Sequence, residues 1–199
     1  MDYIKDFRFS IFPCGYWDEK QKRAMPQQRQ QQTQTIKWVA EYITSERARR
    51  VTEEFRAMAR TATKEQKSDY KVLNFEYATF SGVFDYRKAK NIKSSTPFMT
   101  IDIDDLSSLA EAREVQRKLC RDTRFETVLC FVSPSGLGVK WIVMLPERMS
   151  ALPFKERFDR LRMYVEFNYG FVVDKSGSDV CRACFLPWDN ECFINTKFI

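Results

Sequence analysis

The second half of the chain has the clearest alternation of apolar and polar positions. Residues 98–104 alternate as in a half-buried strand, 127–132 form a continuous apolar run, and 139–145 follow a glycine turn as a returning strand. Segments 171–173 and 182–186 also look extended. Two helices lie between these strands, with predicted inward faces of Leu109, Ala112, Val115 and Leu119, and of Phe154, Phe158, Leu161 and Val165. The order strand–helix–strand–strand–helix–strand is typical of an α+β unit of the ferredoxin-like or RRM-like kind.

The first half of the chain has a weaker pattern. Residues 7–13 alternate as a strand, whereas the glutamine-rich stretch 14–34 is interpreted as a loop or flexible segment. Stretch 70–84 looks like extended chain broken at Ser81–Gly82. Apolar spacing predicts two helices, one built on Ile36, Val39 and Ile43, and one capped by Ser45 with Ala48, Val51, Phe55 and Met58 inward.

The length of 199 residues and the 44% hydrophobic content allow a substantial core. We expect an N-terminal α/β extension over residues 1–97, packed on a core over residues 98–199. Because no apolar run approaches about 18 residues and the start lacks a signal-peptide pattern, we expect a cytoplasmic protein without a membrane partner. The six scattered cysteines are interpreted as reduced thiols.

The chain contains no histidine. This excludes Ser-His-Asp and Cys-His triads and every histidine-ligated metal site. A metal would have to be held by oxygen or sulfur, and carboxylate oxygens suit Mg²⁺ or Mn²⁺. The net charge of +6 is compatible with a phosphate-bearing partner.

Three clusters of polar residues stand out against this pattern. Asp102 and Asp104 lie on one face of the strand 98–104, about 7 Å apart, where they repel each other unless a cation is near. A solvated pair at a strand end is the alternative. The turn "SPSGLG" brings backbone N–H groups close to an anion and is followed by Lys140, although an ordinary hairpin with an edge lysine also fits.

The third cluster follows the apolar stretch 171–173. Asp174 ends that stretch, Arg182 follows eight residues later, and Asp179 is a second acidic candidate. The spacing of Cys181 and Cys184 suggests a zinc or redox site, but zinc would need two further close ligands, so inward packing of a cysteine is the simpler interpretation.

The predicted topology joins these clusters. In a ferredoxin-like sheet the first strand lies between the third and the fourth, so we expect Asp102 and Asp104 beside Lys140, on the face opposite the helices. If 182–186 is the fourth strand, Asp174 lies near the end of the first. Three carboxylates beside a lysine and an arginine are what metal-assisted phosphoryl transfer requires.

In their order and spacing, the motifs resemble those of archaeo-eukaryotic primase–polymerases. The stretches "FEYATFSGVFDYR", "TIDIDDL", "SPSGLGVK" and "VDKSGSDVCRACFLPWDN" are more specifically similar to the primase-like N-terminal domain that precedes VirE-type helicase regions in Bacteroides mobile elements and phages. The resemblance covers roughly residues 7–195.

The resemblance implies an RRM-like catalytic unit that binds Mg²⁺ or Mn²⁺. Asp102, Asp104 and Asp174 would be the catalytic metal ligands, and the nucleotide phosphates would lie near Ser135, Gly136, Gly138, Lys140 and Arg182. Where that superfamily usually has histidine, this chain has Lys140. A lysine can still bind phosphate as a point charge.

The leading hypothesis is therefore a nucleotidyltransferase domain of the primase–polymerase type. It would use nucleoside triphosphates and a single-stranded DNA template in the replication of a mobile element, with a helicase region or protein as a partner. Trp17, Trp38, Tyr86 and Trp141 are candidates for stacking on template bases. The alternatives are a non-catalytic nucleic-acid or nucleotide-binding module that recruits a helicase, and a metal nuclease, which the absence of histidine disfavours.

Overall fold

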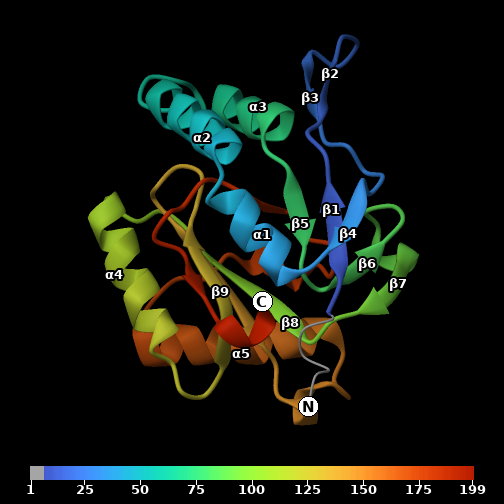
Figure 1. Cartoon of the computed structure of the whole chain (residues 1–199), viewed down its shortest axis with the longest axis vertical. Coiled ribbons are helices and arrows are strands. Elements are labelled where there is room, and N and C mark those ends of the chain that lie inside the picture. Colours follow the sequence, from blue (N-terminus) through green and yellow to red (C-terminus); the bar gives the residue numbers. More distant parts are fainter. Residues whose placement is uncertain (1–6) are drawn as a thin grey trace.

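The computed structural model describes residues 7–199, and two four-stranded antiparallel sheets form its framework (Figure 1). The first sheet has the order β11-β5-β1-β4, with β11 at Cys184–Phe185, β5 at Tyr77–Thr79, β1 at Phe9–Phe12 and β4 at Gln32–Gln34. The second has the order β12-β9-β10-β8, with β12 at Phe193–Ile194, β9 at Glu126–Val132, β10 at Val139–Met144 and β8 at Phe98–Ile103. The α+β class expected from the sequence is confirmed.

The remaining elements are two small hairpins and the helices. One hairpin pairs β2 (Tyr16–Asp18) with β3 (Arg23–Met25), and the other pairs β6 (Gly82–Phe84) with β7 (Ile92–Ser95). The α-helices are α1 (Ile36–Ile43), α2 (Glu46–Met58), α3 (Lys64–Asn74), α4 (Leu109–Cys120) and α5 (Phe154–Tyr169). Short 3₁₀ helices are η1 (Ala89–Asn91), η2 (Glu147–Met149), η3 (Lys175–Ser178) and η4 (Thr196–Phe198). Within residues 7–199, no helix has the length and apolar character needed to cross a bilayer.

The two faces of the second sheet are buried by different partners. Met99, Ile101 and Trp141 point to one face, where they pack in one cluster with buried residues of α4 and α5. Phe98 and Ile142 point to the other, where they pack with residues of β1, β5 and α1. Successive residues of a strand face opposite sides of its sheet. The polar residues that alternate with Met99 and Ile101 on β8 therefore lie on the face that the first sheet covers. The N-terminal and C-terminal parts of the chain therefore share one of their cores.

Most of the predicted helix-forming residues behave as expected. Ser45 caps α2, and the buried faces of α4 and α5 include Val115 and Leu161. Leu109 was expected to point inward but is 45% exposed, because Ser108 caps α4 and places Leu109 at its first position. The residue that begins a helix precedes its regular apolar stripe, so spacing alone assigned it to the wrong face.

Two N-terminal predictions were wrong. Stretch 14–34 is not a loop: it contains the β2–β3 hairpin and β4, which pairs with β1. Residues 70–74 are not extended but end α3, which begins with a capping box formed by Thr63 and Gln66. The polar residues of β4 are held by backbone pairing, and α3 buries no residue completely, so neither segment carries an apolar pattern.

The predicted fourth strand of the second sheet was also misplaced. β8, β10 and β9 have the neighbour order of a ferredoxin-like sheet, but residues 171–173 form no strand, and β11 pairs with β5 in the first sheet. Beside β8, on the edge away from β10, the backbone N–H of Asp174 donates to the carbonyl oxygen of Asp102 (2.9 Å). Cys184 and Leu186 are buried between the sheets, and this apolar burial stabilises the pairing of the segment with the first sheet.

Candidate active site

The central contact of the site is an ion pair between neighbouring strands. The register of β8 and β10 places Lys140 opposite Asp102, and the Lys140 ammonium pairs with Oδ2 of that carboxylate. Its distance to Oδ1 of Asp104 is 3.7 Å. The Lys140 side chain is only 11% exposed, so its charge depends on these carboxylates. The alternative of an ordinary edge lysine in water therefore does not hold.

Asp174 reaches the same place from a different segment. It caps η3, and its Oδ1 accepts a hydrogen bond from the backbone N–H of Ser176 (2.9 Å). Its Oδ2 accepts from Nη2 of Arg182 (3.2 Å). One oxygen each of Asp102, Asp104 and Asp174 lies within 4.8 Å of the other two. The expected proximity is present on the face opposite α4 and α5, although the role of these acids as metal ligands remains a prediction.

One oxygen of this cluster lacks a hydrogen-bond partner. Oδ1 of Asp102 is buried, and no described residue donates to it. Buried carboxylate oxygens in folded proteins nearly always have a donor or a cation. Hard divalent cations prefer such oxygens, and three of them at this spacing can converge on one ion. The donor set therefore fits Mg²⁺ or Mn²⁺.

The surroundings perturb these ionisable groups in different directions. Burial raises the pKa of Asp102, partly offset by the charge of Lys140. Burial lowers the pKa of Lys140, but Asp102 and Asp104 outweigh this effect and raise it overall. Partial burial alone would raise the pKa of Asp174. The hydrogen bonds from Ser176 and the charge of Arg182 have the opposite and larger effect, so the pKa of Asp174 is lowered overall. A positive ammonium thus stays beside the acids.

The glycine turn after β9 positions the site. A Cβ on Gly138 would lie 2.6 Å from the carbonyl oxygen of Ile103 and 2.8 Å from Oδ1 of Asp104, so only glycine permits this close approach. Gly136 has φ 79°, a left-handed conformation that glycine adopts without strain. The N–H groups of Gly136 and Leu137 are already used inside the turn, by the Ser133 carbonyl and the Ser135 hydroxyl. Ligand contacts therefore fall mainly to side chains.

Arg56 on α2 holds this turn from outside. Its Nε donates to the carbonyl oxygen of Pro134 (3.1 Å), and the guanidinium lies against Gly136. Burial lowers the pKa of Arg56. This anchor connects residues 77 positions or more apart and has no signal in the local sequence.

A cleft of about 270 Å³ opens in front of the acids. Its basic lining comes from four segments: Lys71 on α3, Arg87 after β6, Lys140 on β10 and Arg182 before β11. The guanidinium of Arg87 lies over the Tyr77 ring at 5.5 Å, and its buried Nε has no hydrogen-bond partner among the described residues. Lys71 and Arg87 were missed from the sequence, because nothing local distinguishes them from surface residues.

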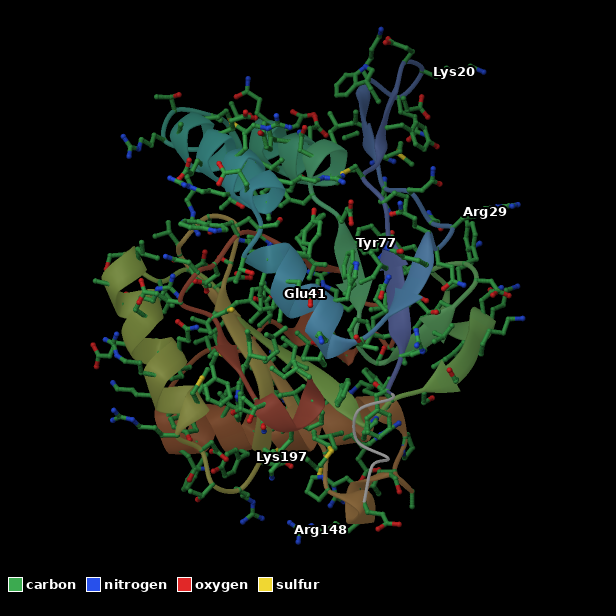
Figure 2. The ribbon with its side chains drawn as sticks, in the orientation of Figure 1. Lys20, Arg29, Glu41, Tyr77, Arg148 and Lys197 are labelled. Atoms are coloured by element: carbon green, nitrogen blue, oxygen red, sulfur yellow. The ribbon has the colours of Figure 1, made fainter. Side chains whose placement is uncertain are left out.

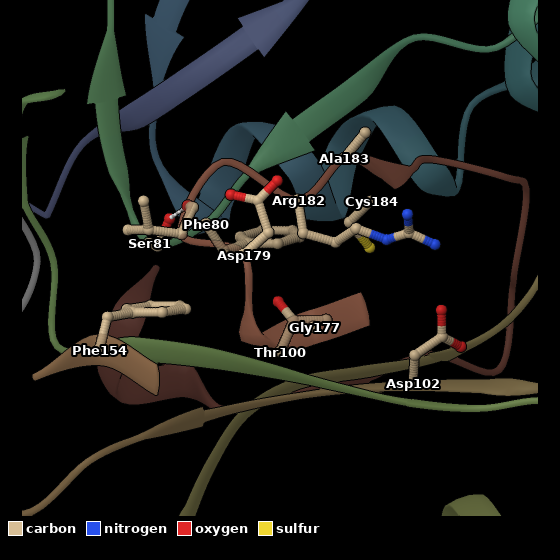
Figure 3. A pocket seen from close by; sticks show the side chains of 11 residues that line it. Phe80, Ser81, Thr100, Asp102, Phe154, Gly177, Asp179, Arg182, Ala183 and Cys184 are labelled. Atoms are coloured by element: carbon tan, nitrogen blue, oxygen red, sulfur yellow. Dashed lines mark hydrogen bonds between the residues drawn. The ribbon is translucent and has the colours of Figure 1, made fainter. Parts of the chain in front are cut away.

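A second, smaller pocket lies behind Asp102 (Figure 3). Its volume of about 30 Å³ leaves room for roughly a water molecule or two, not a nucleotide. Figure 3 shows Asp102 at one end and Phe154 and Ser81 at the other, with Arg182 extending towards the acid. Asp179 lines this pocket outside the three-acid cluster.

The two cysteines whose spacing suggested zinc or redox chemistry are packed into the protein interior. Cys181 and Cys184 are buried, as the packing interpretation predicted, and no cysteine of residues 7–199 belongs to a group of potential metal ligands. The sulfur of Cys181 lies 3.2 Å from Oδ1 of Asp179. The carboxylate cluster is the one metal-type constellation among these residues.

Comparison with known proteins gives a family but no close relative. A scan against protein-family models matches residues 72–193 to the family described as BT4734-like, N-terminal domain. Neither the curated proteins nor the solved structures give a match. The matched range contains all three acids, the glycine turn and both Lys140 and Arg182, and it spans more than half of the chain. The chain therefore belongs to the BT4734-like family.

Proposed function

We propose that this chain is a metal-dependent nucleotidyltransferase domain of the primase–polymerase type. It would join nucleoside triphosphates on a single-stranded DNA template during the replication of a mobile element, with a helicase region or protein as partner. The observation that carries the proposal is the convergence of Asp102, Asp104 and Asp174, the first two of which line a basic cleft. The β8-β10-β9 strand order supports an RRM-like core for this activity, as does the motif order given above.

In the proposed reaction, a 3′-hydroxyl oxygen attacks the α-phosphorus of a nucleoside triphosphate, and the bond to pyrophosphate breaks. A bound Mg²⁺ or Mn²⁺ would neutralise developing charge on the phosphates and favour the deprotonated 3′-oxygen. Asp102, Asp104 and Asp174 would hold it. Lys71, Arg87, Lys140 and Arg182 give the cleft four positive charges for the triphosphate. Because Lys140 replaces the superfamily's usual histidine, it would act as a charge and not as a neutral donor.

The template has a candidate surface next to this cleft. Pro26 lines the cleft and directly follows the β2–β3 hairpin, which projects from the body with Lys20 at its tip (Figures 1 and 2). Tyr16 and Trp17 on this hairpin are 51% and 43% exposed, so both can stack on bases. Trp141, by contrast, is fully buried and is not available.

The experiment is an extension assay with single-stranded DNA, labelled NTPs or dNTPs, and Mg²⁺ or Mn²⁺. Asp104→Asn should abolish product, since it removes one metal-ligand charge from the cleft. Asp105→Asn is the matched control: it changes the adjacent carboxylate, which lies outside the cluster, and asparagine tolerates the φ of 59° found there. Full activity in Asp104→Asn would remove the basis of the proposal.

A non-catalytic nucleotide-binding module is the second candidate. It is favoured by the ion pair between Lys140 and Asp102, which already neutralises one acid without a metal. Metal-dependent triphosphate binding without any extension product would support this candidate. Shortening of the single-stranded DNA, in a parallel assay in which the DNA carries the label, would instead indicate a nuclease.

A further inference from the structure

We infer that the acid cluster holds one divalent cation per chain, because the ammonium of Lys140 takes the place of a second one. This inference rests on the proposed metal-dependent function and concerns how many ions that function uses. It follows from the way the oxygens of the three acids are distributed.

The two oxygens of Asp102 have different partners. Oδ2 pairs with the Lys140 ammonium, whereas the buried Oδ1 has no donor. In two-metal sites the ions lie only about 3.5–4 Å apart, so they share ligands, and a carboxylate between them gives one oxygen to each. Asp102 already gives one oxygen to an ammonium. It therefore has one oxygen left, which suffices for one ion.

The other two acids complete a single coordination sphere. The cluster offers one oxygen from each acid, and these three atoms lie within 4.8 Å of one another. Opposite ligands of an octahedral Mg²⁺ or Mn²⁺ are roughly 4.2 Å apart, so a small closing movement would bring all three oxygens to one ion. Oδ1 of Asp104 also lies 3.7 Å from the Lys140 ammonium. The ammonium is therefore close to two of the three acids.

The charge balance of the cluster also favours a single divalent cation. Three carboxylates face the ammonium of Lys140 and the guanidinium of Arg182, which leaves one net negative charge. One divalent cation reverses this to a single positive charge, suited to a triphosphate. A second would have to approach the same acids against the ammonium of Lys140, which already pairs with one of them.

The test is a titration of the full chain with Mn²⁺ in the absence of nucleotide. Electron paramagnetic resonance measures free Mn²⁺ and detects magnetic coupling between bound ions. The unaltered chain should bind one Mn²⁺ without coupling. Lys140→Met, which keeps a long unbranched side chain but removes its charge, should bind two Mn²⁺ with a coupled signal. Lys71→Met is the control, because it removes a charge from the same cleft but not from the acids, and it should bind one.

Two coupled ions in the unaltered chain would overturn the inference while leaving the proposed function in place. One ion in a folded Lys140→Met variant would overturn it too. No bound Mn²⁺ in the unaltered chain would contradict both the inference and the metal-dependent function. If Lys140→Met does not fold, Lys140→Gln replaces it in the titration. The number of Mn²⁺ ions bound by the unaltered chain tests the inference in either case.

Discussion

Two poorly exposed ion pairs among the described residues, Arg113–Asp189 and Lys140–Asp102, have the same charges but differ in the number of hydrogen bonds that their carboxylates accept. Asp189 is 1% exposed and accepts from Nη1 (2.9 Å) and Nη2 (2.5 Å) of Arg113 and from the backbone N–H of Val132 (2.8 Å) and Glu191 (3.0 Å). Asp102 has Lys140 on one oxygen and no donor on the other. Both oxygens of Asp189 therefore have donors, and in this sense the first pair is closed; it fastens α4 to the C-terminal segment. The second lines the cleft and leaves one carboxylate oxygen without a donor, as expected of a site that takes a ligand.

The largest effect is expected at the closed pair. Arg113→Met would leave a buried carboxylate with only its backbone donors, and breaking such a pair costs about 3–5 kcal/mol of the free energy of unfolding. Urea unfolding measures this loss. Added Mn²⁺ should stabilise the variant and the unaltered chain equally, so the difference between them should remain. Arg117→Met on the exposed side of α4 is the control, with a change within about 0.5 kcal/mol. A loss below about 1 kcal/mol at Arg113 would mean that the two pairs do not differ structurally.

Lys140→Met should have a smaller effect that a metal reverses. The variant leaves Asp102 without its cation, but water can enter from the open cleft, so we expect a loss of about 1–3 kcal/mol. Because an ion that binds only the folded state stabilises it, Mn²⁺ should recover most of this loss. Thermal unfolding with and without Mn²⁺ measures both quantities. If Mn²⁺ raises the unfolding temperature of Lys140→Met no more than that of the unaltered chain, removal of the ammonium does not open this site to a further ion.

Arg56→Met should weaken ligand binding without changing the metal. It removes the donor to the Pro134 carbonyl and frees the turn next to Asp104, and we expect roughly a tenfold loss of triphosphate affinity, or about 1.4 kcal/mol. The number of bound Mn²⁺ ions should stay the same. Calorimetric titration measures both, with Arg50→Met on the exposed side of α2 as control. Equal affinities in the two variants would show that the turn needs no anchor.

The smallest effect is expected at the cysteines beside the acids. Cys181→Ser and Cys184→Ser should leave the metal content and the Mn²⁺ count unchanged, since neither sulfur belongs to the acid cluster. Elemental analysis of the purified variants measures this. Stoichiometric zinc in the unaltered chain that disappears in either variant would contradict it and would reopen the zinc interpretation.

The sequence predicted the elements in which periodicity reflects a single buried face. Met99, Ile101 and Ile103 alternate on β8 because one side of that strand packs on α4 and α5, and this alternation placed Asp102 on the other side. The prediction failed for β4 and α3. β4 is held by backbone pairing to β1, and α3 buries no residue completely. The side chains of these two elements therefore show no periodic apolar pattern from which a strand or a helix could be predicted.

For the candidate site, the sequence determined which residue types are available, and the tertiary structure decided how they are used. The absence of histidine limited a metal site to oxygen or sulfur ligands, and the spacing of Asp102 and Asp104 put both on one face. The pairing of Lys140 with Asp102 depends on strand register, and the approach of Asp174 depends on one backbone hydrogen bond to β8. Lys71 and Arg87 reach the cleft only because the first sheet and α3 fold over it. Such contacts join distant segments, and no local pattern encodes them because their energy comes from packing of the whole chain.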